Sequence, residues 1–80
     1  MDHALPEKKL QEKFFEEIKG CTSVKEIHDI AEAKKEEYQL SEQILNIISG
    51  GYSFYRMYGM NNVDSMIQKI QVQIEKAYET

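Results

Sequence analysis

Hydrophobic residues recur along this chain at the spacing of amphipathic helices, and they divide it into four segments. In the first segment Leu10, Phe14 and Ile18 recur every four residues, behind a proline that suits the first turn of a helix. Gly20 follows at the place where a left-handed C-terminal cap is expected. The pattern therefore predicts a first helix over residues 6–19.

A serine cap marks the start of the second segment. Ser23 is followed three residues later by Glu26, which predicts a capping box in which each side chain accepts a hydrogen bond from the backbone N–H of the other residue. Val24 and Ile27 begin the apolar face of this segment, and the charged run at its end is typical of a solvated surface. We expect the second helix over residues 24–37.

The third segment is the most apolar and aromatic part of the chain, and it contains two adjacent glycines. Ser41 is the expected N-cap. Gly50 and Gly51 each cost about 1 kcal/mol in a helix interior, which would favour an end at Ser49. The four-residue apolar spacing nevertheless continues in phase on both sides of the pair. We therefore favour one helix over residues 42–58, with the glycines as a notch that another helix approaches closely.

The fourth segment follows Gly59 and a pair of asparagines, and it predicts a helix over residues 63–78. Residues 70–74 also alternate like a strand, but the length of the whole pattern favours a helix. Its apolar residues follow four- and three-residue steps, the seam of a helix that packs lengthwise on another: Val63, Ile67, Ile70, Ile74 and Ala77. The four segments predict an all-α fold, a small bundle of four helices in a single domain over residues 1–80.

Composition narrows the classes of function. A chain of 80 residues buries only about 60% of the surface that its unfolded form exposes, so a partner or a second copy would add stability. The formal net charge of −4 argues against direct nucleic-acid binding, which needs a basic face. No apolar run approaches the roughly 18 residues that span a bilayer, so we expect no membrane partner. The first residues have no hydrophobic stretch for export, and we expect a cytoplasmic protein.

The residues that carry metal or covalent chemistry are few and scattered. His3, His28 and Cys21 have no recognised ligand spacing, so we expect neither a metal nor a cofactor. His28 is interpreted as an exposed helical residue, and Cys21 as a small buried apolar residue rather than a nucleophile. Ser65 lies in a triplet similar to the attachment site of carrier proteins, but too few helices follow it. The sequence predicts no enzyme.

Residues 52–60 instead carry the residue types that are enriched in protein interfaces. The candidates for partner binding are Tyr52, Phe54, Tyr55, Arg56, Met57, Tyr58 and Met60. Seven such residues on a helix cannot all face one small core, so we expect this surface to bind a partner protein or a second copy of the chain. The alternative is that Tyr52, Tyr55 and Tyr58 fill the core. Arg56, the only arginine, is the expected anchor.

Two short runs resemble a known family. Residues 21–24, with Ile27 and Ile30 after them, and then residues 38–42, are similar to the Hha/YmoA family of small helical bacterial regulators. Members of that family bind a nucleoid-structuring DNA-binding protein and modulate it, so the resemblance implies a non-enzymatic regulator. Arg56 lies near the central arginine of that family.

A second resemblance implies a different function. The pattern S-x-x-E-I-x-x-I-A over residues 23–31 and Y-x-L-S-E over residues 38–42 are similar to the leader domain of ribosomally made modified peptides, first noted in nitrogen-fixation operons. That resemblance implies cleavage after Gly50-Gly51. A third class, a phage or mobile-element inhibitor that offers an acidic surface to a nucleic-acid-binding enzyme, agrees with the net charge. The favoured prediction is a protein-binding regulator or adaptor.

Overall fold

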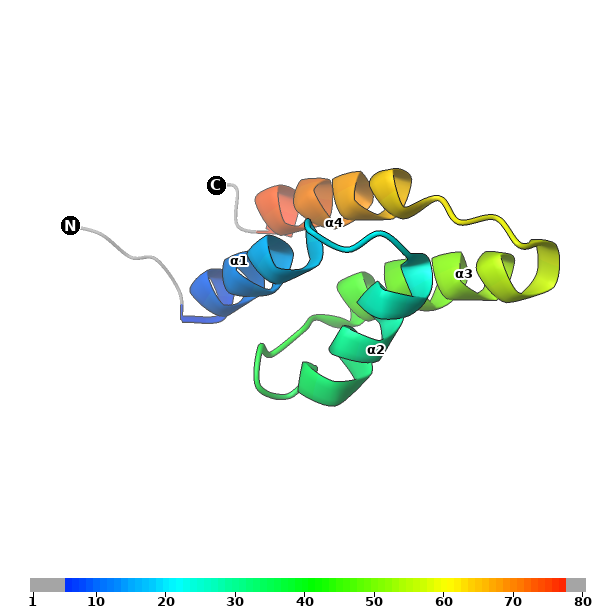
Figure 1. Ribbon diagram of the computed structural model, residues 1–80. Helices are drawn as coiled ribbons and strands as arrows, with labels where there is room; N and C mark the ends of the chain where they lie inside the picture. The colour runs from blue at the N-terminus through cyan, green and yellow to red at the C-terminus, as the bar shows by residue number, and fades with distance from the viewer. Residues whose placement is uncertain (1–5, 78–80) are drawn as a thin grey trace.

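The protein is built of four α-helices, as the computed structural model shows (Figure 1). The structure describes residues 6–77, with side chains from residue 8 onward. The helices are α1 (Pro6–Ile18), α2 (Val24–Lys34), α3 (Glu42–Tyr58) and α4 (Val63–Ala77). The described residues contain no strand, and the predicted all-α bundle of four helices is confirmed.

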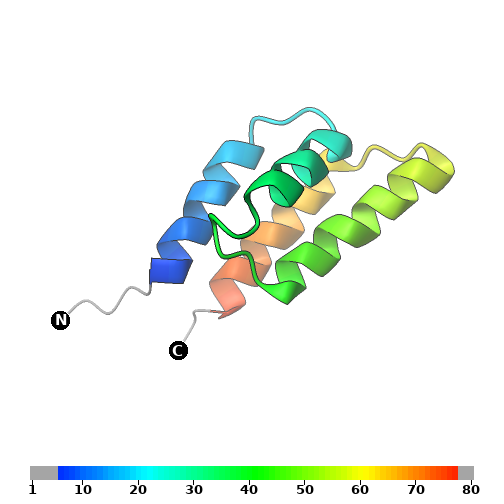
Figure 2. The same cartoon turned by 90° about the horizontal axis from the view of Figure 1, so that it is seen from below.

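The helices run alternately in opposite directions and surround one core. α1 packs against α2 and α4, and α3 also packs against α2 and α4, so α1 and α3 lie on opposite sides of the core (Figures 1 and 2). α3 has 17 residues and α2 has 11, which makes α3 longer by about 9 Å. α3 is the longest of the four helices, and its last turns project beyond the others (Figures 1 and 2).

Each helix contributes buried apolar side chains to this core. In the first two apolar stripes Phe14, Ile18, Val24 and Ile27 lie inward as predicted, whereas Leu10 is only partly buried. Leu40 also enters the core just before α3 begins. The buried apolar residues are Phe14, Ile18, Val24, Ile27, Ala31, Leu40, Ile44, Ile48, Met66, Ile70 and Ile74.

The inward face of α4 differs from the predicted seam. Met66, Ile70 and Ile74 are its buried residues, whereas the expected Ala77 is exposed. The expected Val63 and Ile67 are only partly buried, as is Gln73 beside the buried stripe. α4 packs against both α1 and α3, so a single stripe with a four-residue repeat points between them.

The second helix ends earlier than predicted, at Lys34 rather than at residue 37. Residues 35–39 form a turn in which Gln39 has a left-handed backbone, with φ of 51°. The side chain of Gln11, only 2% exposed, donates from Nε2 to the carbonyl oxygen of Gln39 at 2.9 Å. The chain must reverse here to bring Leu40 into the core. No glycine marks the turn, so the helical pattern alone predicted too long a helix.

The end of α1 also corrects the sequence interpretation. α1 ends at Ile18 rather than at residue 19, and the N–H of Cys21 donates to the Ile18 carbonyl at 2.9 Å. Gly20 does not have the left-handed conformation that a C-terminal cap requires; among the described glycines only Gly59 has it. The loop between α1 and α2 therefore turns without the left-handed backbone conformation that glycine allows.

The predicted capping box at the start of α2 is displaced. The Ser23 hydroxyl accepts from the N–H of Lys25 at 3.1 Å, not from that of Glu26. The Glu26 carboxylate accepts from Thr22, from its N–H at 2.9 Å and its hydroxyl at 3.0 Å. These bonds hold the pKa of Glu26 below its ordinary value. The two side chains still satisfy orphan N–H groups, but each uses a neighbour of the expected partner.

Candidate partner-binding surface

α3 is one continuous helix, as the in-phase apolar spacing predicted. The Ser41 hydroxyl caps its start by accepting from the N–H of Ile44 at 3.3 Å. Its end is fixed by Gly59, whose φ of 68° is left-handed and whose N–H donates to the Tyr55 carbonyl at 2.9 Å. The surface that α3 carries is therefore attached to a regular, capped element.

The two glycines within α3 have different surroundings. A Cβ added to Gly51 would collide with the terminal methyl group of Met66 on α4. A Cβ added to Gly50 would meet no atom within 4 Å. The expected notch is thus present at Gly51, where α4 approaches closely, whereas Gly50 is exposed to solvent.

The predicted partner-binding residues do not form one face. Successive helical residues are 100° apart, so residues four apart share a side and residues two apart point in nearly opposite directions. Tyr52 and Arg56 therefore lie on one side of α3, and Phe54 and Tyr58 lie on another. The structure places Tyr52 against His28 of α2, and Phe54 in the wall of a groove that α4 also lines.

On the α2 side the aromatic residues pack within the molecule. The ring of Tyr52 stacks on the imidazole of His28, with centroids 3.9 Å apart and planes 10° apart. Tyr55 lies beside Tyr52 at 6.3 Å between centroids, and the Arg56 guanidinium carbon is 5.9 Å from the Tyr52 ring centre. Tyr52 and Tyr55 are partly buried against the core. Arg56 thus has an aromatic partner in its own chain.

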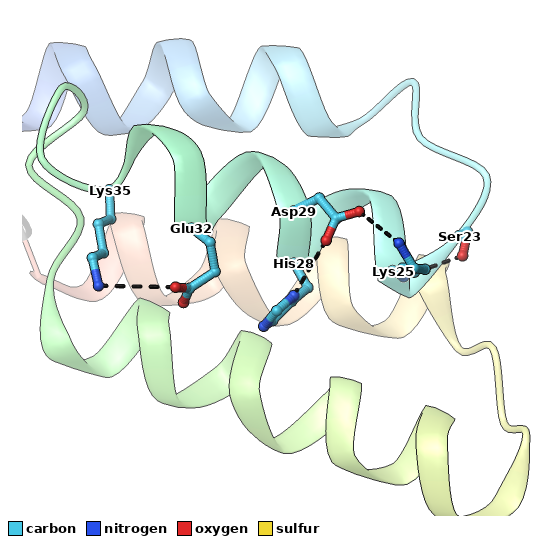
Figure 3. A network of polar contacts seen from close by, with 6 residues as sticks. All are labelled: Ser23, Lys25, His28, Asp29, Glu32 and Lys35. Carbon is cyan, nitrogen blue, oxygen red and sulfur yellow. Dashed lines mark hydrogen bonds and ion pairs between the residues drawn. The ribbon is translucent and has the colours of Figure 1, made fainter.

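His28 is not the simple exposed residue that the sequence suggested. Its side chain is 25% exposed and points from α2 towards α3 (Figure 3). Nδ1 of His28 lies 3.5 Å from Oδ1 of Asp29, in a geometry that forms no hydrogen bond. The Asp29 carboxylate instead accepts a hydrogen bond from the Lys25 ammonium at 2.9 Å, and this bond holds the pKa of Asp29 below its ordinary value. A row of polar side chains on α2, from Lys25 through Asp29 to His28, therefore borders the stacked tyrosines.

On the α4 side and at the end of α3, large apolar side chains face solvent. Phe54, Met57, Tyr58 and Met60, which we call the apolar tip, are 55%, 69%, 62% and 48% exposed. The rings of Phe54 and Tyr58 touch, with centroids 5.7 Å apart. Large side chains of this kind present 150–250 Å² each, so the apolar tip exposes on the order of 400 Å². That area matches the largest patch of a typical monomer, which is often functional.

A groove between α3 and α4 begins beside the apolar tip. It has a volume of about 420 Å³, and Val24, Gly51 and Met66 are among its lining residues. Phe54 and Met60 also line it, so the groove and the apolar tip form one continuous surface.

The loop that carries Met60 is tied to the start of α2. The side-chain oxygen of Asn61 accepts from the N–H of Val24 at 2.8 Å, and its amide nitrogen donates to the Thr22 carbonyl at 3.1 Å. Asn61 thus caps α2 from a distant part of the chain, whereas the sequence predicted that the asparagine pair forms a turn and caps the helix that follows it. These two bonds hold the loop beside the groove.

No protein-family model matches the sequence, and no curated protein or solved structure gives a significant match. The resemblances to the Hha/YmoA family and to leader domains therefore rest on the sequence motifs alone. The apolar tip and its groove are properties of this chain's own geometry.

Other kinds of site find little support in the described part of the chain. Residues 8–77 contain no group of three or more side chains that could hold a metal ion, and His3 lies outside them. Burial, followed by the nearby carboxylates of Glu26 and Glu17, raises the pKa of Cys21, which is the opposite of thiol activation. Among the described helices, none is both long enough and apolar enough for a bilayer crossing.

Proposed function

We propose that the protein is a small non-enzymatic regulator or adaptor that binds another protein through the apolar tip. The observation that carries this proposal is the exposure of Phe54, Met57, Tyr58 and Met60, each about half or more. Covering such side chains removes apolar surface from water, which is the dominant favourable term in protein association. Aromatic residues and methionine are also the types enriched at interfaces.

The position of the apolar tip supports this role. The last turns of α3 project beyond the other helices, so a partner can reach the tip without displacing them (Figures 1 and 2). Gly59 caps the helix and Asn61 ties down the loop, so little conformational entropy is lost when the surface is covered. The resemblance to the Hha/YmoA family would make the partner a DNA-binding protein, with no direct contact between this chain and DNA.

The leader-domain alternative is disfavoured by the position of the glycine pair. Gly50-Gly51 lies inside α3, and a peptidase would have to unwind that helix to bind an extended chain there. Cleavage would also release Met66, Ile70 and Ile74, which are buried core residues. We therefore expect the chain to stay intact when it is co-expressed with a double-glycine peptidase. A product cut after Gly51, detected by mass spectrometry, would favour the leader function instead.

Site-specific photo-crosslinking tests the proposed function. A photoreactive amino acid at Met57 should give a discrete adduct with another protein in the native cells, and Phe54→Ala should remove it. The control position is Lys13, an exposed residue of α1 that is distant in sequence from the apolar tip. The absence of an adduct from Met57, or equal adducts from both positions, would contradict the proposal. Mass spectrometry of the adduct identifies the partner.

A further inference from the structure

The shape and charge of the surface between α3 and α4 indicate what kind of partner segment fits it. We infer that an acidic amphipathic helix of the partner protein docks along the α3–α4 groove and covers the apolar tip with one end. This inference rests on the proposed function and specifies the partner's binding segment.

The groove is long enough for a helix. The hollow beside the apolar tip and a second hollow further along α4 share Ile47, Ser65 and Lys69 as lining residues, so they form one furrow. The furrow extends along the chain from Asn62 to Lys76, which corresponds to about 20 Å of helix. A partner helix of about 14 residues would span it.

The furrow offers apolar contacts along its length. Phe54 lies near one end and Val72, which is 47% exposed, near the other, with Ile47 between them. No hydrogen bond or ion pair links α3 to α4 among the described side chains, so apolar packing alone holds the two walls together. Grooves of this kind bind the apolar face of a helix through anchors at i, i+3 or i+4, and i+7.

The charge of the furrow selects an acidic helix. Lys69 and Lys76 line it, and no carboxylate does, although the whole chain has a formal net charge of −4. Neither lysine makes an ion pair with any residue from 8 to 77. The groove on the opposite side of α4, towards α1, is lined instead by Glu12, Glu16 and Glu75. Acidic side chains on a partner are therefore attracted to the furrow and repelled from the neighbouring groove.

A second copy of this chain fits the same furrow less well. In a two-fold symmetric dimer the same patch meets itself, so the interface would contain Lys69 and Lys76 of both copies and no carboxylate from the lining of either furrow. The same surface of a second copy could not supply acids, because no acidic residue lies between positions 43 and 63 and none lines the furrow. A separate acidic helix can place an apolar face on the floor of the furrow and carboxylates beside Lys69 and Lys76.

Two designed peptides of about 18 residues, slightly longer than the furrow, test the inference. Both carry the same apolar face, and the positions that flank it are glutamate in one peptide and lysine in the other. Fluorescence anisotropy with the full chain should show the glutamate peptide binding at least about tenfold more tightly. The Lys69→Glu/Lys76→Glu variant should reverse this order. The matched Lys9→Glu/Lys13→Glu variant on α1 should leave it unchanged.

Binding of neither peptide, equal binding of both, or an order that the charge reversal leaves unchanged would overturn the inference. Those results leave the proposed function standing as long as the Met57 adduct forms. Loss of that adduct would instead overturn the proposed function. Sedimentation velocity at rising protein concentration provides the third outcome: a dimer that Phe54→Ala abolishes would assign the furrow to a second copy and overturn the inference. Circular dichroism and melting temperature of each variant show that it is folded.

Discussion

The two pairs of helices in this molecule are held together in different ways. Between α1 and the α2 region, the Glu17 carboxylate accepts from the Lys34 ammonium at 3.0 Å and from the Tyr38 hydroxyl at 2.5 Å. Between α3 and α4, no hydrogen bond or ion pair is present among the described side chains, and Met66 packs directly over Gly51. The first pair is closed by directional polar contacts. The second pair relies on apolar packing and leaves a furrow and an apolar tip open to solvent.

This difference separates the scaffold from the proposed binding surface. Polar contacts across α1 and α2 fix one geometry and leave little apolar surface for a partner. The packing of α3 on α4 keeps Ile44, Ile48 and Ile70 inside, while large side chains at the end of α3 are left outside. The same helix thus contributes to the core with its first half and to the surface with its last turns.

The largest expected effect on stability comes from truncating a buried apolar side chain of α4. Ile70 is fully buried, so Ile70→Ala should lower the free energy of unfolding by about 2–5 kcal/mol in urea denaturation. Val72, two residues away, is 47% exposed, so Val72→Ala should change stability by less than about 0.5 kcal/mol. Similar losses in the two variants would show that the furrow is not open at Val72.

The hydrogen bonds of Glu17 between α1 and the α2 region should make a pH-dependent contribution to the free energy of unfolding. Tyr38→Phe removes a hydrogen bond to Glu17 and should cost about 1 kcal/mol at neutral pH. The hydrogen bond from Tyr38, followed by that from Lys34, holds the pKa of Glu17 below its ordinary value of 4.5. Because the carboxylate is the stabilised form, its contribution is present above that value and is lost as the pH falls through the lowered pKa. Between pH 7 and pH 3 the free energies of unfolding of the wild type and of Tyr38→Phe should converge. A difference that stays constant with pH would contradict this account.

The two glycines of α3 offer a smaller and more specific comparison. Gly50→Ala should raise the free energy of unfolding by about 0.5–1 kcal/mol, since alanine favours a helix and the position is open. Gly51→Ala should raise the free energy of unfolding by less, because the methyl group of Met66 must move away from the added methyl group. Thermal unfolding of both variants measures the difference. Equal stabilisation would mean that α4 does not approach α3 closely at Gly51.

The smallest effect on partner affinity is expected from a substitution on the α2 side of α3. Arg56 lies over the ring of Tyr52 and points away from the side of α3 that carries Phe54 and Tyr58. Arg56→Ala should therefore change the affinity for the partner by less than about threefold, as is common for residues outside a hot spot. A larger loss, measured by titration calorimetry, would extend the binding surface to the α2 side.

Much of the fold was predictable because its signals are local. Apolar spacing and serine caps located all four helices, and the phase of that spacing across Gly50-Gly51 predicted a continuous α3. The early end of α2 was not predictable, since it depends on a left-handed Gln39 and on the buried side chain of Gln11, which lies far away in the sequence. The cap that Asn61 provides to α2 is likewise a tertiary contact.

The candidate site was only partly predictable. Composition indicated residues 52–60, and the angular spacing of a helix could already have divided them into two sides. The stack of His28 on Tyr52 depends on how α2 and α3 are aligned, which no local pattern encodes. The furrow left one visible signal, because Lys69 and Lys76 are seven residues apart and so share a face of α4.

The most direct test of the proposed function is the affinity of the full chain for the partner recovered from the Met57 adduct. Titration calorimetry should show the Phe54→Ala/Met57→Ala variant binding at least about tenfold more weakly than the wild type, with an unchanged melting temperature. Lys13→Ala should bind like the wild type. An affinity that the double variant leaves unchanged would contradict the assignment of the apolar tip as the binding surface.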